Sequence, residues 1–288
     1  MAGTTTESQE SGLKPQHQRW LAAIALVFAV AYTLFPVLWL LNNSFKTRLD
    51  MFSSPPIYIN GNPTLFNYIQ AFVERPFLQY MLNSAIVAIC TTLLSLTAGT
   101  LAGYALARYD YGRAKKHISM WILSTRMMPP IVSIIPLYIM FSYFSLLDTK
   151  TALVVAYSGF NLPFVVWMMK SYFAEIPRDL EESAQVDGDT NLGALFRVIL
   201  PLAAPGLAAT SIFCLILSWN EFLLALIVTN TDRANTLPIG IAGRITQYKV
   251  EWGEISASGF AACVPIVLFA FVVQRHLVRG LSFGAVKG

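Results

Sequence analysis

Six long stretches of almost uncharged sequence dominate this chain and limit the structures that it can form. A helix needs about 20 mostly apolar residues to cross the hydrocarbon core of a bilayer, which is roughly 30 Å thick. Only Arg126 and Glu221 carry a charge within the six stretches. The stretches cover residues 21–41, 81–107, 118–143, 151–169, 202–228 and 255–274. We therefore predict an all-α polytopic membrane protein with six transmembrane helices.

The overall composition agrees with this interpretation and excludes several other classes of protein. Only 12% of the residues are charged, whereas a soluble domain carries about 25%. Six buried core helices in a soluble chain of 288 residues would leave no amphipathic helices to cover that core. The composition also excludes a disordered chain, a collagen-like fibre, a disulfide scaffold and a nucleic-acid-binding protein. The separate cysteines and scattered histidines predict no metal site.

Positive charges predict the orientation of the chain in the membrane. The first apolar stretch is too long for a signal peptide and no small-residue cleavage site follows it, so we expect a retained anchor. Lys and Arg concentrate on the side of the N-terminus, most densely at 108–117, and cytoplasmic loops carry such an excess. Both termini are therefore predicted to be cytoplasmic. We expect an N-terminal tail at 1–20, one six-helix domain at 21–278 and a C-terminal tail at 279–288.

The polar segment 175–201, between the fourth and fifth predicted spans, has the pattern of two short helices joined by a turn. Acidic residues cluster in the first turn of the first helix, where the helix dipole favours them. Gly188 suits a left-handed helix stop, and Asp189 or Thr190 can cap the second helix. Four apolar residues form a stripe on the second helix: Leu192, Leu195, Phe196 and Ile199.

This helix–turn–helix segment needs a partner surface, because two short helices without a core of their own cannot bury their apolar faces alone. Lipid headgroups are one alternative partner. The acidic residues of the segment disfavour lipid, since the inner leaflet of the membrane is itself negatively charged. We therefore interpret the segment as a docking site for another protein on the cytoplasmic side.

The spacing within this segment resembles the EAA loop in membrane subunits of binding-protein-dependent ABC importers. The family pattern is E-A-A, three residues, G, nine residues, I, one residue, L-P, and this chain departs from it only where Ser183 replaces the first Ala and Val198 replaces Ile. Residues 102–108, 218–222 and 280–288 resemble the sugar-importing branch and its smaller, six-helix maltose-type permease. The resemblance implies the type I ABC importer (MetI-like) permease fold and a bacterial inner-membrane location.

The resemblance also implies that the chain is one permease subunit of a carbohydrate importer. The expected partners are a second permease, an ATPase dimer and an extracytoplasmic sugar-binding protein. Glu182 would meet a basic side chain of the ATPase, while Leu195 and Phe196 would fill a groove on it. The docking residues implied by the family pattern are Glu182, Ser183, Ala184, Asp187, Gly188, Leu195, Phe196, Leu200 and Pro201. The C-terminal tail would reach between the ATPase subunits through Gly284, Val286 and Lys287.

The chain lacks the sequence motifs of an enzyme active site. A phosphate-binding loop needs GxxxxGK[ST], and the closest segment, 188–195, lacks the lysine and the hydroxyl. HExxH and GxSxG are absent as well. We therefore expect a non-catalytic permease with no cofactor of its own, whose ATP and Mg²⁺ are bound by the separate ATPase.

Polar side chains inside the spans are the first candidates for a substrate pathway, since such groups are costly in lipid and face a cavity or a partner. Sugars are held by hydrogen bonds and aromatic stacking, which adds tyrosine and tryptophan. The candidates are Arg126, Tyr157, Asn161, Trp219, Asn220 and Glu221. Other roles stay open: a tie between helices for Arg126, and a periplasmic gate or a contact with the binding protein for Asn220 and Glu221. Gly99 and Gly103 form a GxxxG pattern, which predicts close helix packing.

Two other functional classes remain as alternatives. A secondary transporter would show inverted repeats and buried carboxylates near the midplane, but no convincing repeat is visible and Glu221 is the only carboxylate inside a predicted span. An intramembrane enzyme would need a paired catalytic constellation, and none is visible. Within the importer class, a polyol or a glycerol-phosphate is the alternative to a sugar.

Overall fold

The computed structural model describes residues 15–246 and 249–284 of the chain. Most of this part is helical, and the only strand-like pairing within it is an isolated bridge between Ile245 and Val250. Four helices are long and apolar enough to cross a membrane alone: α1 (Pro15–Ser44), α4 (Phe77–Arg108), α7 (Lys150–Glu175) and α14 (Trp252–Gly284). Two bent pairs of helices bring the number of spans to six if each pair counts as one. The predicted all-α polytopic architecture is confirmed.

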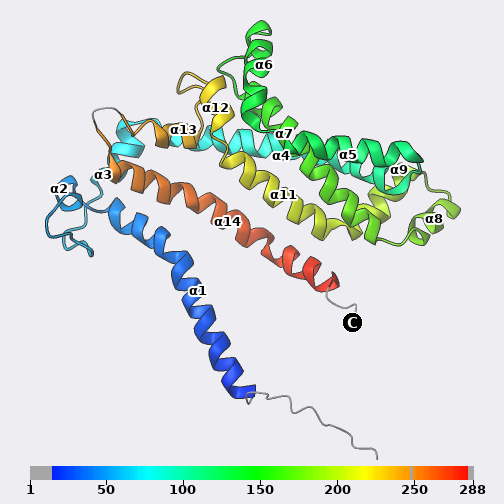
Figure 1. Ribbon diagram of the computed structural model, residues 1–288, viewed down its shortest axis with the longest axis horizontal. Helices are drawn as coiled ribbons and strands as arrows, with labels where there is room; N and C mark the ends of the chain where they lie inside the picture. Colours follow the sequence, from blue (N-terminus) through cyan, green and yellow to red (C-terminus); the bar gives the residue numbers. More distant parts are fainter. Residues whose placement is uncertain (1–14, 247–248, 285–288) are drawn as a thin grey trace, which may run out of the picture.

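The third predicted span is not a single straight helix. α5 (Arg113–Met127) and α6 (Pro130–Tyr143) meet at an angle of 91°, and Figure 1 shows α6 pointing away from the bundle. Two adjacent prolines, Pro129 and Pro130, explain the break, because proline lacks an amide hydrogen and forces the residue before it out of helical geometry. The apolar stretch predicted as one span over 118–143 is therefore formed by two helices with a sharp bend between them.

The fifth predicted span is also divided. α11 (Ala204–Trp219) and α12 (Leu223–Val228) are separated by a short non-helical break. The carboxylate of Glu221, inside this break, accepts two backbone amide hydrogens from α12, at 2.9 and 3.3 Å, and so caps that helix. The preceding helical run, Asn191–Leu202, is bent by 78° from α11. The apolar stretch predicted as one span over 202–228 is therefore also formed by more than one helix.

α4 and α7 share more contact than any other two helices in the described chain. Two glycines of α4 allow this close approach. A Cβ atom on Gly99 would lie 2.6 Å from Cγ1 of Val165, and one on Gly103 would lie 2.9 Å from the backbone nitrogen of Lys170. The packing role predicted for the GxxxG pattern is confirmed.

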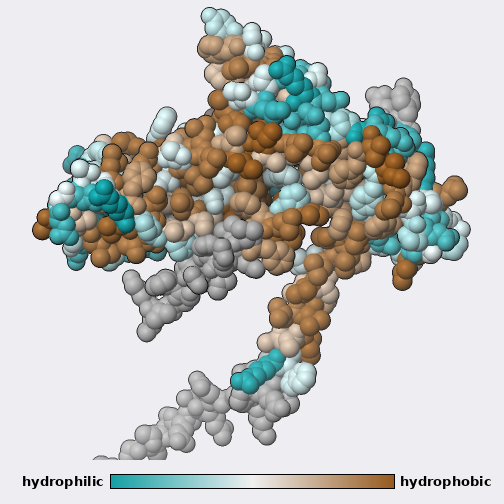
Figure 2. Space-filling view, turned by 180° about the vertical axis from the view of Figure 1, so that it is seen from behind, coloured by the Kyte–Doolittle hydropathy of each residue, from teal (hydrophilic) through white to brown (hydrophobic). Residues whose placement is uncertain are grey.

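The shorter helices gather mainly at the two ends of the bundle (Figure 1). At the end that we call the loop end lie α8 (Asp179–Val186) and α9 (Asn191–Ala194), followed by the π-helical segment η2 (Leu195–Ile199) and α10 (Leu200–Leu202). At the other end, the far end, lie α2 (Arg48–Met51), α3 (Phe66–Ile69), the π-helical segment η1 (Gln70–Glu74) and α13 (Leu237–Ala242). Figure 2 shows apolar side chains over the middle of the body between these ends and along much of α1.

The helices nearest the two termini lie beside each other. α1 packs on α14 and otherwise stands away from the bundle (Figure 1). α14 continues to Gly284, so the C-terminal tail predicted at 279–288 begins inside this helix rather than after it. Val286 and Lys287, the other two residues predicted for the coupling tail, lie outside the described residues.

Candidate functional site

The segment 175–201 has the predicted helix–turn–helix structure. α8 ends at Val186, and Gly188 adopts the left-handed conformation with a φ of 93°, which glycine tolerates best. The hydroxyl of Thr190 accepts a hydrogen bond from the backbone nitrogen of Gly193 at 3.1 Å, so Thr190 rather than Asp189 caps α9. Asp189 instead forms an ion pair with Arg197. Local bonds therefore fix the angle between the two helices.

The inner face of this segment is buried against the bundle. Leu195 and Ile199 are fully buried and share one apolar cluster with Met169 and Phe173 of α7. The role predicted for Leu195, filling a groove on the ATPase, is therefore wrong, because this side of the helical run faces the chain's own core. Of the two apolar residues predicted to enter the groove, Phe196 alone is accessible.

The outer face of the segment is exposed and mixes acidic with apolar side chains. Glu182, Ser183 and Asp187 are exposed, and the aromatic side chain of Phe196 is 58% exposed. Val186 is exposed as well. The remaining predicted docking residues are partly or fully accessible: Ala184, Gly188, Leu200 and Pro201. Exposed apolar side chains rimmed by polar ones mark a contact site for another molecule.

A buried ion pair holds the segment to the end of α4. Nε of Arg108 lies 2.8 Å from Oε2 of Glu181, and the two side chains are only 7% and 9% exposed. The hydroxyl of Tyr104 donates to Oε1 of Glu181. Sequence reasoning missed this pair and selected the neighbouring Glu182. One signal was available in the sequence, since Glu181 lies three residues before the apolar Ala184 and therefore shares a helix face with it.

A pocket of about 290 Å³ lies where the two broken spans meet α7. Four of the six predicted pathway residues line it: Arg126 of α5, Tyr157 and Asn161 of α7, and Glu221 from the break before α12. The break between α5 and α6 contributes Met128 and Pro130. The remaining lining residues are Phe160, Leu217, Ser218 and Leu224. Helix breaks are costly in lipid and are tolerated where they line a cavity, which fits this position.

The polar groups of this pocket are partly engaged with the protein. Nη1 of Arg126 donates to the carbonyl oxygen of Phe160 at 2.9 Å, so Arg126 ties α5 to α7 as well as lining the pocket. Nδ2 of Asn161 donates to the hydroxyl of Ser218 at 2.9 Å. The buried hydroxyl of Tyr157 has no hydrogen-bond partner within the described chain. The arrangement offers a guanidinium, an amide, a carboxylate and a phenol hydroxyl, groups that bind a polar molecule by hydrogen bonds.

The other two predicted pathway residues lie outside this pocket. Trp219 is buried in a separate apolar cluster with Tyr80 and Leu237. Asn220 is exposed, and its side-chain amide donates to the carbonyl oxygen of Ile216 one turn earlier. The α11 helix turns Trp219 toward α4 and α13, which corrects its predicted place in the pathway, while Asn220 completes the end of its own helix and stays a candidate.

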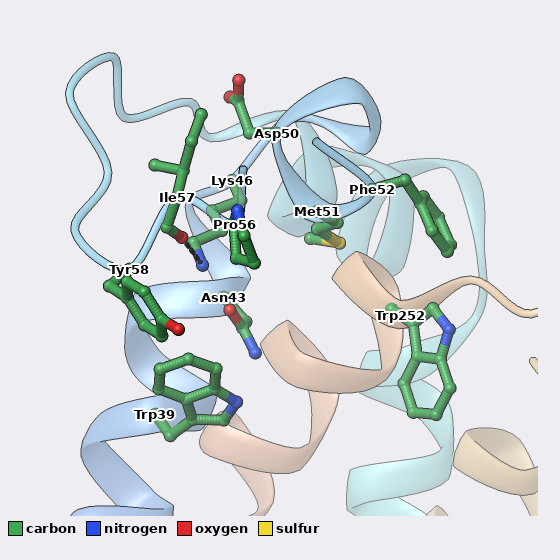
Figure 3. Close-up of a pocket in the computed structure, with 10 residues that line it drawn as sticks. All are labelled: Trp39, Asn43, Lys46, Asp50, Met51, Phe52, Pro56, Ile57, Tyr58 and Trp252. Carbon is green, nitrogen blue, oxygen red and sulfur yellow. Dashed lines mark hydrogen bonds between the residues drawn. The ribbon is translucent and has the colours of Figure 1, made fainter. Parts of the chain in front are cut away.

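A second pocket, of about 240 Å³, lies at the far end between α1 and the start of α14 (Figure 3). Trp39, Tyr58 and Trp252 line it, and such amphipathic rings gather where a membrane meets water. The ammonium group of Lys46 donates to the carbonyl oxygen of Ile57 at 2.7 Å and lies 5.1 Å from the centre of the Trp39 ring. Lys46 therefore holds the following loop onto α1, and the pocket is explained by the packing of that loop.

Comparison with known proteins identifies the family. Residues 98–283 match the family described as binding-protein-dependent transport system inner membrane component. The sulfoquinovosyl glycerol transport system permease protein SmoH of Agrobacterium fabrum is 36% identical over 93% of this chain and 94% of its own length. The trehalose/maltose transport system permease protein MalG of Thermococcus litoralis is 32% identical over 94% of this chain and 98% of its own length.

A solved structure has the same fold. A chain from a bacterial ABC transporter involved in the import of the acidic polysaccharide alginate superimposes with a TM-score of 0.73 at 19% identity, covering 94% of this chain and 99% of that one. The type I importer permease fold expected from the EAA pattern is thereby confirmed. This multi-pass protein therefore belongs to the family of inner membrane components of binding-protein-dependent ABC transport systems.

Proposed function

We propose that this chain is one of two permease subunits in an ATP-driven importer of a sugar or sugar derivative. The observation that carries the proposal is the 175–201 segment, whose inner face is fixed to the bundle while its outer face is exposed. The relatives support the substrate class, because SmoH and MalG are named for transport of sulfoquinovosyl glycerol and of trehalose and maltose. A polyol or a glycerol-phosphate is the alternative substrate.

An ATPase subunit is the proposed partner of the outer face. Glu182 is accessible to a basic side chain of that subunit, and Phe196 is accessible to an apolar groove. ATP and Mg²⁺ would be bound by the ATPase, and this chain would contribute no catalytic group. The loop end would face the cytoplasm, which the Lys and Arg residues at 108–117 support. Val286 and Lys287 are proposed as a further contact with the ATPase dimer.

The pocket at the two helix breaks is the proposed part of the substrate pathway in this chain. Its support is that four polar residues chosen from the sequence converge there. A second permease subunit would complete the pathway, since α5 and α6 each bury only one residue within the described chain. An extracytoplasmic binding protein would deliver the substrate at the far end.

The exposed side chain of Phe196 offers a direct test of ATPase docking. We expect Phe196→Ala to lower the amount of ATPase that co-purifies with the permease pair by about tenfold, because a buried aromatic anchor carries much of the energy of an interface. Phe144→Ala is the matched control, since Phe144 is 62% exposed beyond α6 and lies outside the loop. Equal loss of ATPase in both variants, or no loss in either, would contradict docking through Phe196.

The substrate class is tested separately on the binding protein. Thermal shift of that protein with a panel of sugars, polyols and glycerol-phosphates should show stabilisation by a sugar or a sugar derivative, because ligand binding to the folded state raises the unfolding temperature. Stabilisation by glycerol-phosphate or a polyol alone would replace the proposed substrate and leave the importer assignment intact.

A further inference from the structure

We infer that Tyr104, Arg108 and Glu181 form an anchor that transmits movement of α8 to the end of α4, which makes Arg108 and Glu181 positioning residues for coupling. The inference rests on the proposed function, because it takes the force on α8 to come from an ATPase at the outer face. It concerns the opposite face of α8, where the side chains point into the permease itself.

Contacts of the three side chains join four elements at one point. Arg108 reaches Glu181 of α8, and its Nη2 donates to the carbonyl oxygen of Ile176, directly after α7, at 3.1 Å. The hydroxyl of Tyr104 donates to Glu181 and lies 3.3 Å from the carbonyl oxygen of Asn191 in α9. Nη2 of Arg178, at the start of α8, also donates to the carbonyl oxygen of Ala107 in α4, but at 3.5 Å, so the shorter contacts of Glu181 are the main link between the two helices.

Burial makes this anchor difficult to open. The arginine and glutamate side chains are each at least nine-tenths buried, and separating them would leave an unpaired charge in a poorly solvated place. The Nε–H bond does not point directly at Oε2, so that contact is a close ion pair, while Tyr104 and Ile176 supply the directional hydrogen bonds. When α8 moves, breaking the anchor therefore costs more free energy than moving the end of α4 together with α8.

The two neighbouring glutamates of α8 consequently have opposite roles. Glu182 is exposed and faces outward, whereas Glu181 is buried and faces α4. The other ion pair of the segment joins Asp189 to Arg197, whose side chain is 77% exposed, and exposed pairs hold little energy. Loss of Glu182 should weaken ATPase binding, while loss of Glu181 should leave binding intact and uncouple hydrolysis from transport.

The test uses the complete transporter, with both permeases, the ATPase and the binding protein, reconstituted in proteoliposomes. Glu181→Gln removes the charge and keeps the side-chain volume. We expect ATPase co-purification to be unchanged and uptake per ATP hydrolysed to fall by about tenfold, the range of a typical coupling between sites. Asp179→Asn, an exposed charge removal on the same helix, should leave both quantities unchanged. Tyr104→Phe should reduce uptake per ATP hydrolysed by less than Glu181→Gln does.

A purely structural anchor predicts a different result. If uptake per ATP hydrolysed is unchanged in Glu181→Gln, for example because uptake and hydrolysis fall in equal proportion, the inference is overturned. Failure of the proposed function is distinguishable, because the unmodified complex would then retain no ATPase or show no ATP-driven uptake.

A distance measurement decides the question even if Glu181→Gln does not assemble. Spin labels at Asp179→Cys on α8 and Leu101→Cys on the exposed side of α4, in a complex whose permease carries alanine at its native cysteines, report the separation of the two helices. The distance should be the same without nucleotide and with a slowly hydrolysed ATP analogue. A change of more than about 5 Å, one helical turn, would show that α8 moves independently of α4.

Discussion

The α4–α7 pair and the α5–α6 pair show that apolar sequence forms continuous helices in one part of this chain and a sharply bent span in another. α7 contains Pro163 in its interior and still runs unbroken from Lys150 to Glu175, while α5 and α6 are bent apart at two adjacent prolines. α7 is buried along much of its length against α4, whereas α5 and α6 each bury a single residue within the described chain. Pro36 also lies inside the unbroken α1, which is largely exposed, so single prolines are tolerated here and the span breaks where two prolines are adjacent.

The continuous helices and the broken spans lie at different sites of the molecule. The continuous pair ends at the loop end, where Arg108 and Ile176 meet α8. The broken spans meet at the pocket, whose lining includes residues from both breaks. One part is a closely packed pair of continuous helices, and the other presents polar side chains to a cavity. Variants that disturb each part separately should therefore have different consequences.

The largest effect is expected in the packed pair. Gly103→Leu would place side-chain atoms into the backbone of Lys170 and the side chain of Met169, and neither can move without separating α4 from α7. Overpacking of this kind costs about 3 kcal/mol or more, so we expect a strongly reduced yield of folded permease and a lower thermal unfolding midpoint in detergent.

Gly159→Ala is the matched control within α7. A Cβ atom at Gly159 would meet nothing within 4 Å, and alanine favours a helix over glycine by about 1 kcal/mol. The unfolding midpoint should stay the same or rise slightly. If Gly103→Leu were as stable as Gly159→Ala, the close contact between α4 and α7 would not be the structural centre of the chain.

A smaller effect is expected at the break before α12. Glu221→Ala removes both bonds to the α12 backbone amides and should cost about 1 kcal/mol, the usual value of a helix cap. Glu221→Gln keeps one acceptor oxygen and should retain most uptake in proteoliposomes supplied with ATP. An ion-coupled transporter would instead lose transport when its one carboxylate inside the predicted spans is neutralised. Loss of uptake in Glu221→Gln, together with uptake by the unmodified protein that follows an ion gradient and needs no ATP, would therefore favour ion coupling.

Periodicity and apolar length were enough to predict the all-α fold, the approximate places of the spans and the GxxxG contact, because these depend on local sequence. Apolar length alone does not show where a span bends. The adjacent pair Pro129–Pro130 is a stronger helix breaker than a single proline, and single prolines lie inside the unbroken helices α1 and α7. The break at Glu221 depends on a side chain folding back onto the next helix, which no periodic pattern reveals.

The candidate site was predictable to a similar extent. Gly188 and Thr190 act within their own turn, so the turn followed from local sequence. The inward orientation of Leu195 and Glu181 depends on how the segment lies against α4 and α7, which residues distant in sequence determine. Trp219 and Asn220 were adjacent candidates, yet a helix turns neighbouring side chains in different directions, and neither reached the pocket.

The smallest effect is expected at the link between the start of α7 and the segment that follows α12. Asp148, just before α7, accepts hydrogen bonds from the backbone nitrogens of Asn230 and Thr231 at 2.9 and 3.0 Å and from the Thr231 hydroxyl at 2.6 Å. Partial burial by itself would raise the pKa of Asp148, but these hydrogen bonds outweigh it and lower the pKa below its usual value. Asp148 has a positive φ of 57°, which asparagine also tolerates, so Asp148→Asn changes the charge without straining the backbone.

The pH dependence of this link follows from the lowered pKa. A carboxylate whose pKa is lower in the folded state stabilises that state above its unfolded pKa of about 4, and the contribution is lost as the pH falls through the folded value. Asp148→Asn should therefore lower the free energy of unfolding by about 1 kcal/mol near neutral pH, a value reduced by solvent screening, and the difference should shrink in acid. Denaturant unfolding of both proteins across this range, with Asp179→Asn as control, measures it. A difference that grows as the pH falls would mean that Asp148 does not join α7 to the end of α12 through its charged form.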